Sequence, residues 1–399
     1  MKILFLSDVP LENPISGAEQ VLYQQAVGLV REGMEVFAIT RQEGPSSVTF
    51  RNVDGVEEAC YSALAKNMIR FFFSLLKKPP YLYNRFIQEG PFEVCISHQP
   101  FTCLALLKRR KLKDVPMLYV FHSPSHEEYM LFHEDKSWLK NLPHISVRRR
   151  AEKFCLKRAT RIMVLSRYMK EKIQNIHGIP ADRITINPGG VDLARFKPVQ
   201  DRKLLKKQLG FPDGMIHLLT VRNLDSRMGI DNLLKCINIL KKRQTRIHLI
   251  LGGEGPERKK LEDLIVEYGL NNEVTMAGFI PSELLPQYYA AADFFILPTR
   301  QLEGFGLVTI ESMACGTPVV GTPVGGTVEI LSGLDKQFLF RDTSPDSMAE
   351  GIQMALDRHF SQEQKYDELR IYCRKYVERK YSWQRHLSQL IAIIDEIIK

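Results

Sequence analysis

The chain has 399 residues, of which 44% are hydrophobic and 25% charged, and this ordinary globular composition excludes a disordered or fibrous protein. One hydrophobic core rarely organises so long a chain, so we expect two domains. The excess of 55 basic over 46 acidic residues gives a formal charge of +9, which suits phosphorylated ligands, an anionic membrane face or nucleic acid.

The cysteines indicate a reducing compartment. There are seven, an odd number, and none forms a CxxC pair or lies near histidine at the spacing of zinc ligands. A run of only four apolar residues precedes Ser7, too short for the core of a signal peptide, and no stretch approaches the ~18 apolar residues of a membrane span. We therefore expect a cytoplasmic protein.

Much of the basic excess lies between Lys108 and Arg161. A solvated helix face is the simplest interpretation. No interleaved aromatic residues or nucleic-acid module accompany the charge, so nucleic acid is not an expected partner. Together with the apolar and basic stretch 68–78, these residues could instead rest the first domain on the anionic inner face of a membrane.

Short apolar runs alternate with amphipathic segments of helix length, which is typical of parallel α/β sheets. A helix over 18–32, ended by Gly33, follows the first strand. The expected strands of the first half are 2–7, 35–40, 92–98, 117–122, 161–166 and 183–188.

A second series of strands begins after the Pro188-Gly189-Gly190 turn, and three helices, 344–358, 361–379 and 383–398, close the chain. The expected strands are 216–221, 246–252, 274–278, 293–298, 318–321 and 337–340. The fold class is therefore α/β with two Rossmann-like doubly wound domains, 1–190 and 191–378, and 379–399 is expected to cross back to the first domain. Ligands of such sheets bind at the carboxyl ends of the strands, so we expect the site in a cleft between the domains.

The loop after the expected strand 293–298 is the strongest candidate for chemistry. Gly304 and Gly306 would let the backbone approach a ligand, and the free amides of Leu307 and Val308 could hold phosphate oxygens. Glu303 and Glu311 lie on either side of this phosphate position. Their carboxylates could therefore accept from a sugar and a ribose, or they could be an ordinary loop residue and a helix residue.

The segment 303–331, EGFGLVTIESMACGTPVVGTPVGGTVEIL, closely resembles the signature of the retaining GT-B glycosyltransferases of family four (glycosyl transferases group 1). The two glutamates separated by seven residues are part of that signature. Further matches follow in order along the chain: Ser16–Glu19, Asn187–Asp192, Gly253–Pro256, Val274–Ile280 and Ala291–Asp293.

The resemblance implies transfer of a hexose-type sugar, with retention, from a UDP- or GDP-sugar to a lipid-linked, polysaccharide or small-molecule acceptor. It implies no metal and no cofactor beyond the donor. Carried over, Glu303 contacts the sugar and Glu311 the ribose. The loop residues Gly304, Phe305 and Gly306 with the amides of Leu307 and Val308 receive the diphosphate, and Gly17 lets the first loop approach it. The segment Gly278, Phe279 and Ile280 holds the base, and His122, at the end of a strand, binds the sugar near the reacting carbon.

One part of the site departs from the family pattern. The usual positions of an arginine and a lysine that clamp the diphosphate hold Asn223 and Met228, and each is preceded by an arginine. We assign the clamp to Arg222 and Arg227. A sugar-nucleotide epimerase on the same fold and a non-catalytic nucleotide-sugar-binding subunit are the alternative functions.

Overall fold

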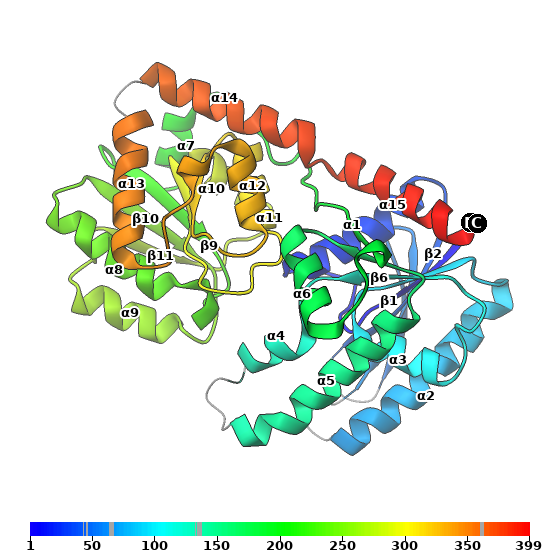
Figure 1. Cartoon of the computed structure of the whole chain (residues 1–399). Helices are drawn as coiled ribbons and strands as arrows, with labels where there is room; N and C mark the ends of the chain where they lie inside the picture. Colours follow the sequence, from blue (N-terminus) through cyan, green and yellow to red (C-terminus); the bar gives the residue numbers. More distant parts are fainter. Residues whose placement is uncertain (43, 45–46, 64–67, 132, 134–137, 360–362) are drawn as a thin grey trace. The chain divides into compact units, whose positions relative to one another are not determined.

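The computed structural model describes residues 1–42, 44, 47–63, 68–131, 133, 138–359 and 363–399, and these form two compact units (Figure 1). Unit 1 comprises Met1–Pro188 and Gln384–Lys399, and unit 2 comprises Gly189–Trp383. The expected boundary followed residue 190, and the expected return segment began at 379. In the structure, helix α14 (Glu363–Lys380) lies within unit 2, and the return to unit 1 begins at Gln384.

Unit 1 is built on one eight-stranded sheet in the order β3-β4-β2-β1-β5-β6-β7-β8. Neighbouring strands pair in parallel, except that β3 is antiparallel to β4. The strands are β1 Lys2–Leu6, β2 Glu35–Gln42, β3 Val48–Val53, β4 Val56–Ser62, β5 Val94–Ser97, β6 Met117–Phe121, β7 Arg161–Val164 and β8 Ile184–Ile186. Its helices are α1 Gly17–Arg31, α2 Met68–Phe86, α3 Pro100–Lys108, α4 Ser125–Leu131, α5 Trp138–Arg158, α6 Arg167–His177 and α15 Trp383–Ile398, with 3-10 turns at Ile87–Glu89 and Ala181–Arg183.

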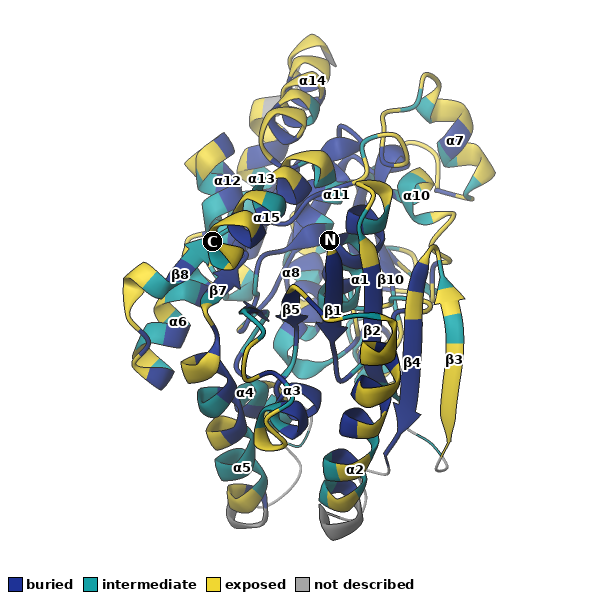
Figure 2. Cartoon of the chain, turned by 90° about the vertical axis from the view of Figure 1, so that its right-hand side faces the viewer, coloured by how far each residue is buried: buried dark blue, intermediate teal, exposed yellow. Residues whose placement is uncertain are grey.

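The hairpin β3–β4 was missing from the expected strands. Residues of β3 are mostly exposed on both faces, as expected of an edge strand, so the strand carries no apolar run (Figure 2). The turn at Asp54 and Gly55, both with positive φ, joins the two strands and was the available sequence signal for a hairpin.

The hydrophobic core of unit 1 contains residues of both its first strand, β1, and its last helix, α15. Every residue of β1 is buried, and Leu390 and Ile394 of α15 pack in the same apolar cluster as Ile3 and Phe5 (Figure 2). Gly28 of α1 marks the closest approach, because a Cβ there would lie 2.5 Å from Leu387. Helix α15 is therefore an integral part of unit 1.

Unit 2 has a five-stranded parallel sheet in the order β11-β10-β9-β12-β13. The strands are β9 Ile216–Val221, β10 Ile247–Gly252, β11 Val274–Gly278, β12 Phe294–Leu297 and β13 Val319–Gly321. The helices are α7 Arg202–Gln208, α8 Ile230–Lys242, α9 Arg258–Glu267, α10 Leu285–Ala291, α11 Leu307–Ala314, α12 Thr327–Leu334, α13 Pro345–His359 and α14, with a 3-10 turn at Ser226–Met228.

The expected strand 337–340 is wrong. Lys336–Phe338 forms a 3-10 turn instead, and only an isolated bridge from Leu339 to Gly321 continues the sheet. The carboxylate of Asp335 accepts from the amide of Gln337 at 3.0 Å and so caps the turn. A short apolar run cannot reveal this local competition.

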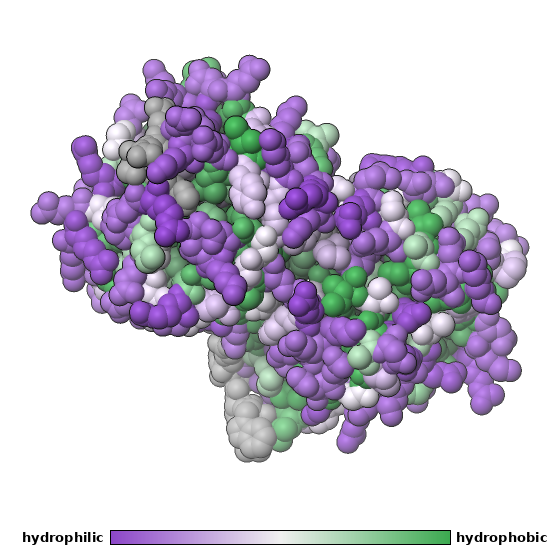
Figure 3. All heavy atoms as spheres, turned by 45° about the horizontal axis from the view of Figure 1, so that its top comes forward, coloured by the Kyte–Doolittle hydropathy of each residue, from purple (hydrophilic) through white to green (hydrophobic). Residues whose placement is uncertain are grey.

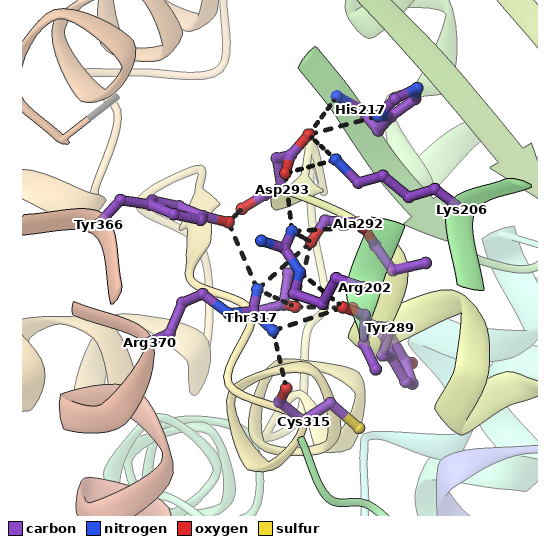
Figure 4. A network of polar contacts seen from close by, with 12 residues as sticks. Arg202, Lys206, His217, Tyr289, Ala292, Asp293, Cys315, Thr317, Tyr366 and Arg370 are labelled. Atoms are coloured by element: carbon purple, nitrogen blue, oxygen red, sulfur yellow. Dashed lines mark hydrogen bonds and ion pairs between the residues drawn. The ribbon is translucent and has the colours of Figure 1, made fainter. Parts of the chain in front are cut away.

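A buried ionic network fixes the start of β12 (Figure 4). Lys206 contacts both carboxylate oxygens of Asp293 at 2.8 Å, Arg202 contacts one at 2.7 Å, and the amide of His217 donates to the other at 2.8 Å. Burial alone would raise the pKa of Asp293, but the hydrogen bond from His217 and the charges of Lys206 and Arg202 hold it below its usual range. The Tyr366 hydroxyl, on α14, donates to the Asp293 carbonyl at 2.6 Å. The start of β12 is therefore firmly anchored.

Among the described residues, no helix is long and apolar enough to cross a bilayer. On the face drawn in Figure 3, hydrophilic side chains predominate and apolar ones form small patches. All seven cysteines are buried and free.

Candidate active site

The sheet of unit 2 has its topological switch at β9. Strand β10 lies on one side of β9 and β12 on the other, so the carboxyl ends of β9 and β12 diverge into loops that can receive a ligand. Arg222 follows β9 directly, and Glu303 lies in the loop after β12. The candidate residues of unit 2 therefore gather where a doubly wound sheet binds its ligands.

The loop after β12 leads into α11 through Gly306. This residue has φ +96°, a conformation that favours glycine, and a Cβ there would lie 2.6 Å from the hydroxyl of Thr327 and 3.2 Å from that of Thr309. The amides of Leu307 and Val308 begin the first turn of α11. They are among the helix amides that lack an intrahelical partner and can bind an anion.

Two buried threonines strengthen this anion position, and we did not identify them from the sequence. The hydroxyls of Thr309 and Thr327 are buried and have no hydrogen-bond partner within the described ranges. Buried polar atoms are nearly always paired, so unpaired hydroxyls beside a helix N-terminus indicate a place for a ligand. Both threonines lie inside the segment 303–331, but their type and spacing are also those of ordinary core threonines.

The structure brings Arg222 and Glu303 together as an ion pair. Nη2 of Arg222 lies 2.5 Å from Oε2 of Glu303, and the side chains are only 7% and 11% exposed. The same guanidinium donates to the sulfur of Met228 at 2.8 Å, and Thr299 donates to Glu303 at 3.4 Å. The sequence identified both residues but assigned them to different parts of the donor, so this pairing is new.

Arg227 is held differently. Its Nη1 donates to the carbonyl of Leu302 at 3.0 Å, and its Nε lies 3.4 Å from Asp225. Burial raises the pKa of the Asp225 carboxyl, while the charge of Arg227 opposes that rise. Arg227 therefore ties the turn after β9 to the loop after β12.

Glu311 lies on α11 and accepts a hydrogen bond from the Tyr289 hydroxyl at 3.1 Å. Burial raises the pKa of Glu311 to about 7, although Tyr289 and the charge of Arg195 lower it in part. Near neutral pH this carboxyl therefore exchanges a proton readily. It can donate to or accept from a hydroxyl-bearing ligand.

The expected base-binding segment follows β11. Gly278 has φ +66°, Phe279 exposes 62% of its surface, and Ile280 is buried. The neighbouring position 253 requires glycine, because a Cβ there would lie 1.8 Å from the carbonyl oxygen of Arg222. The glycine-rich turn after β10 thus lets the Arg222 loop pack closely.

In unit 1, His122 follows β6 and lies 2.9 Å, Nε2 to Nδ1, from His98 at the end of β5. Burial lowers the pKa of His122 to about 4 and that of His98 well below its usual value. Both rings are therefore neutral at pH 7, and His98 fixes the orientation of His122. The sequence identified His122 but treated His98 only as the last residue of a strand.

Gly17 is the first residue of α1 and is exposed. The preceding Ser16 accepts from the Glu19 amide at 3.3 Å, and the Glu19 carboxylate accepts from the Ser16 amide at 3.0 Å. This capping box holds the loop after β1 in place.

No group of three or more His, Cys, Asp or Glu side chains in the described parts of the chain is arranged to hold a metal ion.

Two doubly wound α/β units, one with free helix amides beside paired acidic and basic side chains, have the fold of the GT-B glycosyltransferases. Family models match both halves: "Glycosyltransferase Family 4" over residues 15–195 and "Glycosyl transferases group 1" over residues 201–377. The chain belongs to the family-four glycosyltransferases.

Similar proteins agree with this assignment. An uncharacterised glycosyltransferase of Methanocaldococcus jannaschii is 24% identical over 92% of this chain and 91% of its own. A D-inositol 3-phosphate glycosyltransferase of Pseudarthrobacter chlorophenolicus is 28% identical over 81% and 79%. The structure of a sucrose-phosphate synthase from Thermosynechococcus elongatus superposes with a TM-score of 0.79 at 22% identity, over 99% of both chains, and shows the shared fold.

Proposed function

We propose that the protein transfers a hexose-type sugar, with retention of anomeric configuration, from a UDP- or GDP-sugar to a lipid-linked, polysaccharide or small-molecule acceptor. The observation that carries the proposal is the start of α11. There, Gly306 exposes helix amides beside two unpaired buried hydroxyls, next to the Arg222–Glu303 pair. Such a site binds a diphosphate on one side and reaches a sugar on the other.

We assign the following roles, which these contacts support. The amides of Leu307 and Val308 receive the diphosphate. Glu303, already oriented by Arg222, accepts from sugar hydroxyls. Glu311 accepts from the ribose. His122, held neutral and oriented by His98, offers a hydrogen bond to the sugar.

We also propose that no divalent metal is needed, because cationic and amide donors can meet the charge of the departing diphosphate. The Arg222 guanidinium offers a fixed fork of donors. Preorganised donors of this kind stabilise developing negative charge by about 2–4 kcal/mol each. A chelator should leave the rate unchanged. Loss of activity that a divalent ion restores would refute this part.

The decisive experiment is a donor screen across UDP-, GDP- and ADP-sugars with hydrolysis and transfer as readouts, followed by NMR of the product anomer. Glu303→Gln keeps the size of the side chain and should abolish most transfer while nucleoside diphosphate affinity is retained. Glu311→Gln should weaken nucleoside diphosphate binding in calorimetry. The reverse pattern, or an inverted product, would overturn the assignment.

We further propose that unit 1 associates peripherally with an anionic membrane. Phe73 and Tyr81 of α2 are 65% and 63% exposed, and Lys77 lies 5.0 Å from the Phe73 ring. Each basic residue near such a surface contributes about 1 kcal/mol, so binding should weaken as salt rises. Sedimentation with anionic vesicles tests this proposal, and Phe73→Ser should weaken binding. Ile371→Ser is the matched control, because Ile371 is a 55% exposed apolar residue of unit 2. Equal binding to neutral vesicles would refute it.

A further inference from the structure

The carboxyl ends of β1, β5 and β6 in unit 1 border a cavity of about 160 Å³. This is several times the roughly 30 Å³ that one water occupies in the liquid, so a small ligand group fits. The charged or titratable side chains that carry the argument are Asp8, Arg41, His98, His122, Arg148 and Glu152.

Arg41 lies near the end of β2 and lines the cavity. Its Nε and Nη1 are buried and make no hydrogen bond within the described residues. The nearest recorded contact is with the Phe71 ring, whose centroid lies 5.6 Å from the guanidinium carbon. Buried cations are almost always paired with an anion, and the described residues supply none to these two nitrogens.

Arg148 of α5 is the second cation of the cavity. Its closest polar contact is a weak one, 3.4 Å from Nη1 to the hydroxyl of Ser125, and the guanidinium stacks over Tyr129 at 4.6 Å. Burial is the main cause that lowers the pKa of Arg148, the charge of Asp8 opposes this shift, and the charge of Arg41 adds to it. Both guanidinium groups line this cavity, and their like charges oppose each other there.

The carboxylates at the cavity already have other partners. Asp8 accepts from two amides at the start of α3, each at 2.9 Å. Glu152 accepts from His177 at 2.8 Å. Glu128 is exposed and accepts from Ser123. None of these contacts neutralises the guanidinium of Arg41.

We propose that this cavity binds a phosphate group of the acceptor through Arg41 and Arg148. The inference rests on the proposed function, since His122 lines the same cavity. Two close cations fit the two negative charges of a phosphate monoester better than the single charge of a carboxylate. Each guanidinium can also donate two parallel hydrogen bonds to two oxygens of a phosphate.

The test is binding of defined probes to the full chain. Glucose 6-phosphate should bind in calorimetry, and it should raise the unfolding temperature more than glucose or glucuronate does. Arg41→Leu and Arg148→Leu should each weaken glucose 6-phosphate binding by about tenfold or more, the effect of losing a charge-assisted contact. Arg150→Leu is the matched control, because Arg150 is an exposed neighbour on the same helix.

A second readout separates a ligand site from a structural role. Without ligand, Arg41→Leu should unfold at the same temperature as the parent or higher, because it removes an unpaired buried charge. A clear drop in unfolding temperature would make Arg41 structural and overturn the proposal. Equal probe binding by parent and Arg41→Leu, or no binding of any phosphate probe by the parent, would also overturn it. Glucuronate binding as strong as that of glucose 6-phosphate would refute the preference for phosphate.

Phosphatidylcholine vesicles with and without phosphatidic acid distinguish a lipid phosphate from a soluble one. Binding to phosphatidic acid that is lost in Arg41→Leu assigns the cavity to a lipid-linked acceptor, whereas Arg41-dependent binding of glucose 6-phosphate alone assigns it to a soluble acceptor. Donor hydrolysis by the parent is scored separately. Its absence would refute the proposed function without changing the outcome of these binding measurements.

Discussion

Replacing Arg222 with Met tests whether the Arg222–Glu303 pair is a working part of the donor site. The change leaves the Glu303 carboxylate, only 11% exposed, without its cation at 2.5 Å. Removing one partner of a buried ion pair costs about 3–5 kcal/mol, and the residual exposure of both side chains favours the lower end. For a domain of roughly 150–250 residues, about 3 kcal/mol corresponds to a fall of about 6–12 °C in the unfolding temperature.

Differential scanning calorimetry of the full chain, with and without nucleoside diphosphate, measures this effect. The double variant Arg222→Met with Glu303→Leu should recover most of the lost stability, because no charge is left unpaired. Turnover should fall by about a hundredfold or more in both variants, because the donor loses a charge-stabilising contact. Arg341→Gln is the control, since Arg341 is 69% exposed. An Arg222→Met protein as stable as the parent would refute the reasoning.

Four further predictions concern Glu311, Gly306 and Asp293 of unit 2. Nucleoside diphosphate affinity should fall as the pH drops from 8 to 6 in the parent but less in Glu311→Gln, because the Glu311 carboxyl, with a pKa raised to about 7, becomes protonated in that range. Because the pKa of Glu311 is raised in the folded state, its protonated carboxyl stabilises the fold fully below the ordinary glutamate pKa. This stabilisation is lost as pH rises through 7, so Glu311→Gln should be more stable than the parent at pH 8 in denaturant titrations. Gly306→Ala should lower both stability and transfer, whereas Gly214→Ala, with φ +70° and no atom within 4 Å of its Cβ, should show only the backbone strain of about 1–2 kcal/mol. Asp293→Asn should lose about 3 kcal/mol or more at neutral pH. Because the pKa of Asp293 is depressed, the stability of the parent falls as pH drops below the usual aspartate range, and the variant should show a shallower acid limb in thermal scans.

Sequence periodicity located most of the sheet because buried parallel strands read as continuous apolar runs. It failed where burial is absent or where a local hydrogen bond competes. The exposed edge strand β3 has no such run, and Asp335 converts the stretch 336–338 into a capped turn. Both failures lie at margins of a sheet, where tertiary packing constrains the chain least.

The candidate site was predictable where a motif carries it, as with Glu303 and Glu311. The partners of those residues were not predictable, because contacts between distant loops are not encoded by spacing. Nothing in the sequence indicates that Arg222 meets Glu303, that Tyr289 meets Glu311, or that Nε and Nη1 of Arg41 find no partner in the described parts of the chain. These contacts depend on the order of strands in a sheet, which only the folded chain supplies.

Helix α15 has a consequence for how the protein is made. Unit 2 is an insertion within the chain of unit 1, and the side chains of Gln25 and His386, which lie 2.9 Å apart, are separated by 361 positions. Contacts this distant in sequence must close a long loop and therefore form late. During synthesis, all of unit 2 emerges before the sixteen residues of α15 can cover the apolar surface of α1. Unit 1 is thus begun first and finished last, and until then the apolar surface that α15 covers stays exposed.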